Sequence, residues 1–203
     1  MDAGAADQRL GWVPAPQQGW VAPHIASEFP GLGIAWVEVD AKPGKSPEPV
    51  RRRLRDLSDR TYGSQAIRLR ERPIPWAYRV FYRQIGLDPD RTRTAVEQLT
   101  LDRLHDGGFR SRGLPADALN IAIVETGVAL RAFDADSIEG RLCIRDSAPG
   151  EALAGHLGEM AKGTLTIADE ARPVGLLFGP TAEGFGVEPG SRRIVVAAVQ
   201  VKG

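Results

Sequence analysis

The chain has few of the residues on which crosslinked or metal-bound folds depend. Among its 203 residues there is one cysteine, Cys143, so no internal disulfide can form. The three histidines, His24, His105 and His156, lie far apart and lack the paired spacing of common zinc sites. We therefore expect neither a bound metal nor a cofactor. Cys143 lies within an alternating apolar segment, which predicts a buried and unreactive thiol.

Long apolar runs are also missing. No stretch of about 18 apolar residues occurs, which excludes a membrane-spanning helix and a membrane partner. The first residues, MDAGAADQRLGW, lack the basic start and apolar centre of a signal peptide, so we expect a cytoplasmic protein. The length suits one domain with its own core, over residues 31–203. Residues 1–30 are proline-rich and predict an irregular arm, from which Trp12 and Trp20 pack onto the body.

The chain has no net charge, but its charges are unevenly distributed. Residues 51–112 contain 15 arginines, no lysine and eight acidic residues, a local excess of seven positive charges. One interpretation is a polyanionic partner such as RNA. The other is a set of solvated helix faces with internal ion pairs.

Capping signals predict the helices. Residues 46–48 combine a serine cap, a proline at the first position and an acid close behind it. Thr94 and Glu97 form a capping box ahead of a later helix. The last predicted helix begins near Ala116, where Asp117 is expected to cap the first turn, and it ends at Gly127.

One predicted helix carries both aromatic and basic residues. It runs from Pro75 to Gly86, and Trp76, Val80 and Phe81 are expected to point inward. It contains two residue pairs at i,i+4 spacing, Tyr78 with Tyr82 and Arg79 with Arg83. One interpretation is that these side chains hold a phosphate and a stacked base of an RNA. The other is that the tyrosines are core residues and the arginines are their neighbours.

Alternating apolar residues predict strands before and after the helices. The segments are residues 31–41, 128–133, 141–145, 164–168, 174–178 and 193–201. The last is almost continuously apolar, which favours burial on both faces. The glycine-rich residues 179–190 are expected to form a mobile loop. This order predicts an α+β fold: a mixed, largely antiparallel sheet flanked by helices on one side.

Two features point to a site, one within the predicted helix that ends at Gly127 and one in the loop before that helix. Asn120 is a polar residue within an apolar helix, and a buried amide without partners costs about 1–3 kcal/mol. It is therefore either a structural clamp that bonds the local backbone or a group that points into a site. The basic loop at residues 109–114 leads into this helix, and Arg110 and Arg112 could bind an anion there.

Longer stretches support a family resemblance. AYRVFYRQIGLDPDRTRTAVEQL, LPADALNIAIVETGVALRAFDADSIEGRLCIR, APGE and GTLTIADEARPVGLLFG occur in that order. Together they resemble the B3/B4 domain of the phenylalanyl-tRNA synthetase β subunit, over roughly residues 47–201. No other synthetase module is visible, so we expect a free-standing B3/B4 protein. The resemblance implies a mixed α/β domain whose sheet is walled by helices.

The resemblance also implies a site. In the synthetase this domain hydrolyses tyrosine mischarged onto the phenylalanine tRNA. The family asparagine falls on Asn120, and the family glycine turn falls near Gly179. The extended segment that lines the site falls on Ala129 and Leu130. The family histidine just before the AFD run is replaced here by Arg131.

The last strand lacks a further family residue. A glutamate that recognises the tyrosine hydroxyl lies there, where this chain offers only Val195, Val196, Ala197 and Ala198. A site that hydrogen-bonds a hydroxyl discriminates far better than an apolar one. The resemblance therefore predicts a substrate other than tyrosyl-tRNA.

Ester hydrolysis of aminoacyl-tRNA requires a positioned water and donors for the developing oxyanion. Asn120 is expected to orient that water or bind the substrate amine, and Arg131 to bind a carboxylate or the terminal phosphate. Glu125 is the nearest acid and could act as a base or amine anchor. Because it projects about 140° from Asn120 on a helix, it could instead be an ion-pair partner.

Three functions follow as hypotheses. The first is a trans-acting aminoacyl-tRNA deacylase. The second is a non-catalytic module that binds the tRNA acceptor end or an amino-acid-like ligand. The third is a family fold recruited to another small-molecule or protein-interaction role. The sequence does not indicate an oligomeric state.

Overall fold

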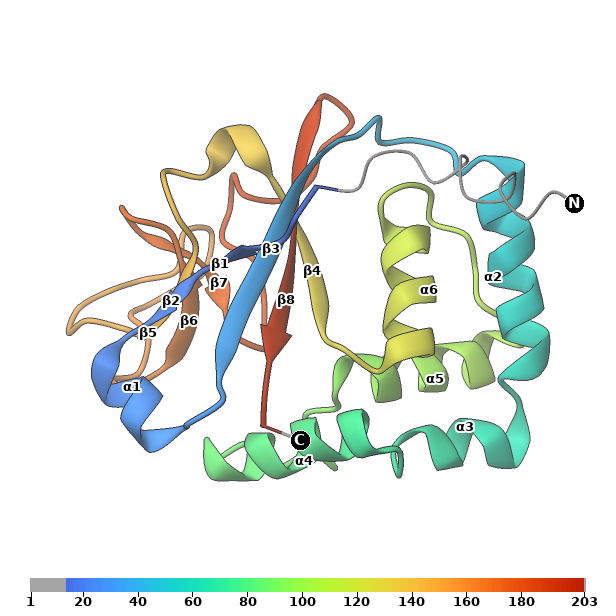
Figure 1. Cartoon of the computed structure of the whole chain (residues 1–203), viewed down its shortest axis with the longest axis horizontal. Helices are drawn as coiled ribbons and strands as arrows, with labels where there is room; N and C mark the ends of the chain where they lie inside the picture. The colour runs from blue at the N-terminus through green and yellow to red at the C-terminus, as the bar shows by residue number, and fades with distance from the viewer. Residues whose placement is uncertain (1–13, 203) are drawn as a thin grey trace, which may run out of the picture.

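The computed structural model describes residues 14–202, which form two four-stranded sheets packed against each other (Figure 1). A layer of helices covers the outer face of one sheet. The fold is therefore α+β with largely antiparallel sheets, as the order of the predicted elements indicated.

The first sheet lies next to the helices and is antiparallel throughout. Its strands, in spatial order, are β1 (Gln17–Gln18), β3 (Gly33–Asp40), β8 (Arg193–Gln200) and β4 (Leu130–Asp134). The pairing places Ala197 of β8 between Trp36 and Arg131. The C-terminal strand thus lies between strands from the beginning and the middle of the chain.

The second sheet contains the only parallel pair among the described strands. Its order is β2 (Trp20–Val21), β5 (Cys143–Asp146), β6 (Leu165–Ala168) and β7 (Pro173–Leu176), with β2 parallel to β5. The prediction of an irregular arm is wrong for this segment, because its backbone hydrogen bonds to both sheets. Trp20 nevertheless remains 43% exposed, and Trp12 lies outside the described residues.

The main core fills the space between the two sheets. Alternate residues of β8, Val195, Ala197 and Val199, face this core together with Ile144 and Ile167 of the second sheet. The opposite face of β8 is only partly buried, so the prediction of burial on both faces is wrong for that face. Cys143 is fully buried, as predicted, and burial raises the pKa of its thiol to about 11.

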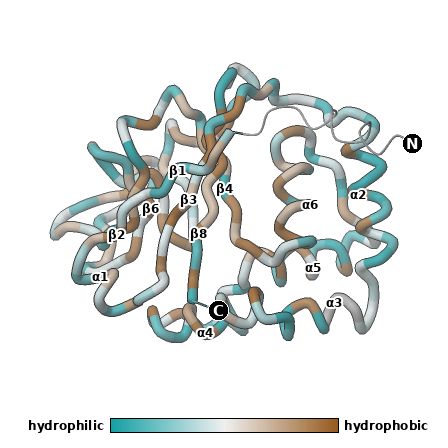
Figure 2. The backbone as a smooth tube through the Cα atoms, in the orientation of Figure 1, coloured by the Kyte–Doolittle hydropathy of each residue, from teal (hydrophilic) through white to brown (hydrophobic). Residues whose placement is uncertain are grey.

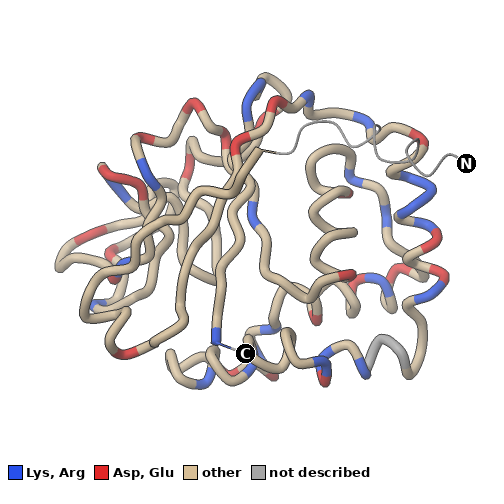
Figure 3. The backbone as a smooth tube through the Cα atoms, viewed as in Figure 1, with Lys and Arg blue, Asp and Glu red and all other residues tan. Residues whose placement is uncertain are grey.

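The helices form a second layer with its own apolar cluster. They are α2 (Glu48–Arg60), α3 (Gly63–Leu69), α4 (Pro73–Gln84), α5 (Ala95–Asp106) and α6 (Ala116–Thr126), while the short α1 (Pro23–Glu28) lies beside the second sheet. Figure 2 shows apolar residues in the strands and on α6 and hydrophilic residues along α2. The charges gather on the helices and turns, and the strands carry few (Figure 3).

Several predicted helix details are confirmed and others are wrong. The capping box of Thr94 and Glu97 is present, and Gly127 ends α6 in a left-handed conformation. Ser46 does not cap α2, because its hydroxyl donates to Asp117. Asp117 in turn does not cap α6, because its carboxylate accepts hydrogen bonds from the preceding loop.

The helix that carries the aromatic residues differs from its prediction in its first residue and in the side chains that it buries. It begins at Pro73, and Phe81 is buried as expected. Trp76 is 50% exposed and Val80 is 38% exposed, so these two side chains do not point inward. Tyr78 and Tyr82 of this helix are buried in the core instead. Helical spacing shows which residues share a face, but which face packs against the sheets depends on tertiary contacts.

The glycine-rich segment after Gly179 is packed rather than mobile. Ala182 and Phe185 are almost completely buried in the main core. The backbone carbonyl of Phe185 accepts a hydrogen bond of 3.0 Å from the N–H of Asp134. The expectation of a mobile loop is therefore wrong, because apolar side chains between the glycines anchor it.

Candidate functional site

Asn120 faces α5 and the basic loop. It lines a small hollow together with Asp102 and Arg103 of α5 and with Arg110 and Arg112 of the loop. The hollow measures about 20 Å³, which is room for about one water molecule. Arg110 is 3.2 Å from the carboxylate of Asp106. Asn120 and the two loop arginines are thus brought together, in a space too small for an amino acid.

A buried carboxylate fixes the loop beside this hollow. Asp117 accepts hydrogen bonds from the hydroxyls of Ser46 at 2.6 Å and Ser111 at 2.5 Å, and from the N–H of Arg112 at 2.7 Å. Burial alone would raise the pKa of Asp117. The hydrogen bonds from Ser111, Ser46 and the loop backbone outweigh it and hold that pKa below its usual value.

Arg131 extends from β4 to the turn after β7. Its guanidinium donates to the carbonyl oxygen of Leu176 and, at 2.7 Å, to the hydroxyl oxygen of Thr181. The same group lies 5.2 Å from the ring centre of Phe133. A side chain at Gly175 would place its Cβ 2.9 Å from the backbone oxygen of Pro180 and 2.8 Å from Arg131 Nη2, and the clash with the backbone favours glycine at this strand position. Sequence reasoning missed Gly175, although a glycine within a strand often marks such close approach.

Arg131 has an unusual electrostatic environment. Among the described residues, no carboxylate lies within ion-pair distance of its guanidinium. Burial lowers its pKa to about 10, with a small opposing effect from Tyr82. A half-buried cation whose neighbours are neutral is a functional-site candidate, because its charge is left to be balanced by an anionic ligand.

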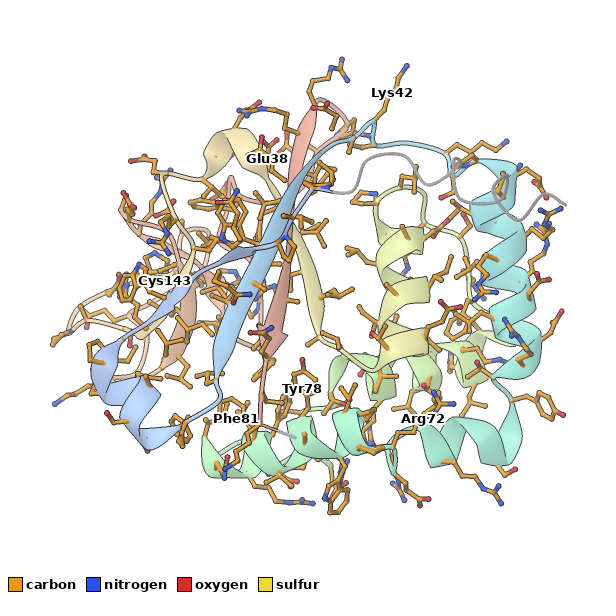
Figure 4. The ribbon with its side chains drawn as sticks, viewed as in Figure 1. Glu38, Lys42, Arg72, Tyr78, Phe81 and Cys143 are labelled. Carbon is orange, nitrogen blue, oxygen red and sulfur yellow. The ribbon has the colours of Figure 1, made fainter. Side chains whose placement is uncertain are left out.

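An aromatic cluster lies next to Arg131. The rings of Tyr82 and Phe178 are 4.6 Å apart, and Tyr78 and Phe81 pack edge-on against Phe178. Figure 4 labels Tyr78 and Phe81 on α4, on the side toward the strands. Burial raises the pKa of Tyr82. The tyrosines are therefore core residues, and the interpretation that they stack an RNA base is wrong.

The arginines of the two i,i+4 pairs have similarly local partners. Arg79 is buried between Glu97 and Asp90, and Arg83 lies 5.9 Å from the ring centre of Trp76. Of the second interpretation, the core tyrosines are confirmed, but the partners of the two arginines are acidic residues and Trp76 rather than the tyrosines.

The other predicted site residues have partners outside the two places described above. Ala129 is buried, and its N–H donates to the hydroxyl of Tyr78 at 3.1 Å. Leu130 packs against the apolar cluster of the helical layer. Glu125 forms an ion pair with Arg53 of α2. Gly179 is exposed, three residues beyond the carbonyl that Arg131 binds.

Two groups of predicted residues result. Asn120, Arg110 and Arg112 surround the small hollow, whereas Arg131 and the turn that contains Gly179 meet between β4 and β7. Within residues 14–202, no three His, Cys, Asp or Glu side chains gather as metal ligands. The same part of the chain contains no helix long and apolar enough to cross a bilayer.

The family model of the B3/4 domain matches residues 77–202. This match covers β4, β7, β8 and α6, the elements that carry both groups of residues. The chain belongs to the B3/4 domain family.

Curated relatives of this B3/4 domain are phenylalanine–tRNA ligase beta subunits. That of Neisseria gonorrhoeae is 36% identical over 112 residues, which is 52% of this chain and 14% of the relative. That of Idiomarina loihiensis is 32% identical over 108 residues, again 52% and 14%. That of Moorella thermoacetica is 35% identical over 107 residues, or 49% and 13%. The chain thus corresponds to less than one sixth of each of these relatives.

Proposed function

We propose that this B3/4 domain binds the aminoacyl end of a tRNA and hydrolyses the ester of a mischarged amino acid. The observation that carries the proposal is Arg131, a half-buried arginine with no described carboxylate partner. It occupies the position to which the family resemblance assigns a histidine. Family membership and the relatives' names support a tRNA-related role.

The geometry at Arg131 suits the stabilisation of negative charge. Leu176 and Thr181 hold the guanidinium in one orientation, and a guanidinium has more N–H donors than these two contacts use. In ester hydrolysis, water adds to the carbonyl carbon and negative charge develops on the carbonyl oxygen. The bond to the ribose oxygen then breaks, which releases the amino acid and the tRNA hydroxyl. A preorganised donor near the carbonyl oxygen lowers the barrier to the first step.

The helical layer supplies positive charge for the RNA. Of the 15 arginines in residues 51–112, Arg51, Arg53, Arg55, Arg79 and Arg110 pair with carboxylates. Several others are exposed on α2, at the start and on the surface of α4, and in the loop before α6; they include Arg52, Arg72, Arg83 and Arg112. We propose that these exposed arginines contact the tRNA backbone, with an affinity that falls as salt rises.

A second candidate is a binding module without catalysis. Glu125 is paired with Arg53, and Asn120 faces α5 rather than the turn at Thr181. Neither residue is therefore close to Arg131 as a partner for water activation. This arrangement favours recognition of the acceptor end over hydrolysis, with Arg131 bound to a phosphate or carboxylate.

Deacylation of a panel of aminoacyl-tRNAs tests both candidates. We expect release of one amino acid by the wild type and a loss of about a hundredfold or more in Arg131→Met, the effect of removing one oxyanion donor. Arg141→Met is the matched control, because Arg141 also donates to a backbone carbonyl, but to that of Gln18 and not to this turn. Binding of the panel without release would favour the second candidate. If the protein neither releases an amino acid nor binds any member of the panel, both candidates are contradicted.

A further inference from the structure

A large cavity lies away from the hollow at Asn120, and it shares part of its wall, residues 176–178, with the turn that Arg131 contacts. It has a volume of about 560 Å³ and opens between α1, the end of α4 and the β6–β7 hairpin. Small-molecule sites usually occupy about 300–1,000 Å³. Its apolar walls include Phe29 just after α1, Ile85 just after α4, and Leu165 and Phe178 of the hairpin region. The cavity therefore has the size and the apolar lining of a ligand site.

Charged groups of both signs surround this apolar space. His24 of α1 lies with its Nε2 3.1 Å from Oδ1 of Asp146 at the end of β5, an interaction that joins the α1 wall to the second sheet. Glu28 lies one turn further along α1. Lys162, in the turn before β6, is exposed at the rim. The carboxylate of Glu28 thus lies on the α1 wall, whereas Asp146 and Lys162 lie on the side of the second sheet, at the end of β5 and just before β6.

The α1 wall is a feature of this chain rather than of the family match. His24, Ile25, Glu28 and Phe29 all precede residues 77–202, which the B3/4 family model covers. This segment is held in place by the pairing of β2 with β5 and by the hydrogen bond from the N–H of Ala22 to the carbonyl of Ile144. The cavity is therefore completed by a well-ordered segment outside the family match.

We propose that this cavity binds a small zwitterion with an apolar body, of the class of the aliphatic α-amino acids. The ammonium of the ligand meets Asp146 and Glu28, its carboxylate meets Lys162, and its side chain packs against Ile85, Leu165 and Phe178. Charge-assisted hydrogen bonds at both ends select a molecule that carries both charges. The inference does not depend on the proposed hydrolysis: Arg131 and Asn120 do not line this cavity, although Leu176, whose carbonyl Arg131 binds, does.

Calorimetric titration with three matched probes tests this assignment. The probes are L-leucine, 3-methylbutylamine, which lacks the carboxylate, and 4-methylpentanoate, which lacks the ammonium. We expect L-leucine to bind about tenfold more tightly than either singly charged analogue, since each charged hydrogen bond contributes at least about 1.4 kcal/mol.

One substitution should remove the preference for a ligand carboxylate, and another should remove the preference for a ligand ammonium. Lys162→Ala is expected to weaken L-leucine and 4-methylpentanoate but not 3-methylbutylamine. Asp146→Asn should weaken L-leucine and 3-methylbutylamine but not 4-methylpentanoate. Two controls match these changes: Lys42→Ala, at the end of the molecule far from α4 (Figure 4), and Asp106→Asn, whose carboxylate pairs with His105 instead.

The pattern across probes and variants decides the result. Saturable binding of L-leucine with both selectivities, retained in Arg131→Met and in the two controls, supports the assignment whether or not the chain deacylates tRNA. Absence of saturable binding at millimolar L-leucine would overturn it. Equal binding of all three probes, or equal loss in the control variants, would also overturn it.

Discussion

Arg79 is a buried arginine and Arg131 a half-buried one, and their surroundings differ. Arg79 on α4 is 5% exposed, and its guanidinium lies 2.5 Å from Glu97 and 2.6 Å from Asp90. Arg131 on β4 contacts the carbonyl of Leu176, the hydroxyl of Thr181 and the ring of Phe133. The first is neutralised within the protein, and the second has only neutral partners among the described residues.

The difference is visible in the pKa of each guanidinium. Burial would lower the pKa of Arg79, but Asp90 and Glu97 raise it above its usual value. For Arg131 burial dominates and lowers the pKa to about 10. A buried charge with its counter-charge links α4 to α5, whereas a half-buried charge without one is suited to an external anion.

The largest expected effect is on stability, from Arg79→Met. The substitution leaves Glu97 buried without its partner, and breaking a buried ion pair in this way costs about 3–5 kcal/mol. The free energy of unfolding, measured by urea denaturation, should fall by that amount. Arg83→Met, on the exposed face of the same helix, is the control and should change it by less than about 1 kcal/mol. A similar small change in Arg79→Met would mean that the pair is not structural.

Arg131→Met should have the opposite profile to Arg79→Met, with a small loss of stability and a large loss of activity. The variant loses two hydrogen bonds to neutral acceptors but also removes a half-buried charge, so we expect a stability loss of no more than about 2 kcal/mol. Binding of aminoacyl-tRNA or its hydrolysis should be lost in the same variant. Equal activity with strongly reduced stability would show that Arg131 is structural, like Arg79.

Asp117 extends the comparison to a buried anion held by neutral donors. Its pKa is lowered in the folded protein, so its contribution to stability is complete above the unfolded pKa of about 4. That contribution is lost as the pH falls through the lower folded pKa. We expect Asp117→Asn to cost about 2 kcal/mol at pH 7. The cost should shrink below pH 4, as measured by urea denaturation at several pH values, and a cost that does not change with pH would contradict this account.

The smallest expected effect concerns Glu125. Its ion pair with Arg53 is partly exposed, and such pairs contribute about 0–1 kcal/mol. Glu125→Gln should therefore change stability by less than about 1 kcal/mol and leave deacylation unaffected. A large loss of activity at unchanged stability would instead support its role as a base or amine anchor.

The sequence predicted what local patterns can determine. Alternation and capping residues were sufficient for the α+β class, for the capping box at Thr94 and for the end of α6 at Gly127. They did not indicate that α4 turns Tyr78 rather than Trp76 inward, since that choice depends on the strands against which it packs.

The neighbours of the candidate site were harder to predict. Arg131 meets Leu176 and Thr181, and His24 meets Asp146, across separations of 45, 50 and 122 residues. Contacts at such separations depend on how the two sheets pack, which periodicity along the chain does not encode. The resemblance singled out Arg131 but not the neutral partners that leave its charge uncompensated.

Binding of a non-hydrolysable substrate analogue tests the role of Arg131 most directly. A 3′-aminoacylamido-adenosine 5′-phosphate retains the acyl group and a phosphate but cannot be hydrolysed. Its dissociation constant, measured by calorimetry, should rise at least about tenfold in Arg131→Met, the effect of losing one charged hydrogen bond, and remain unchanged in Arg141→Met. Equal affinity of the wild type and Arg131→Met would contradict the claim that Arg131 binds the anionic part of a ligand.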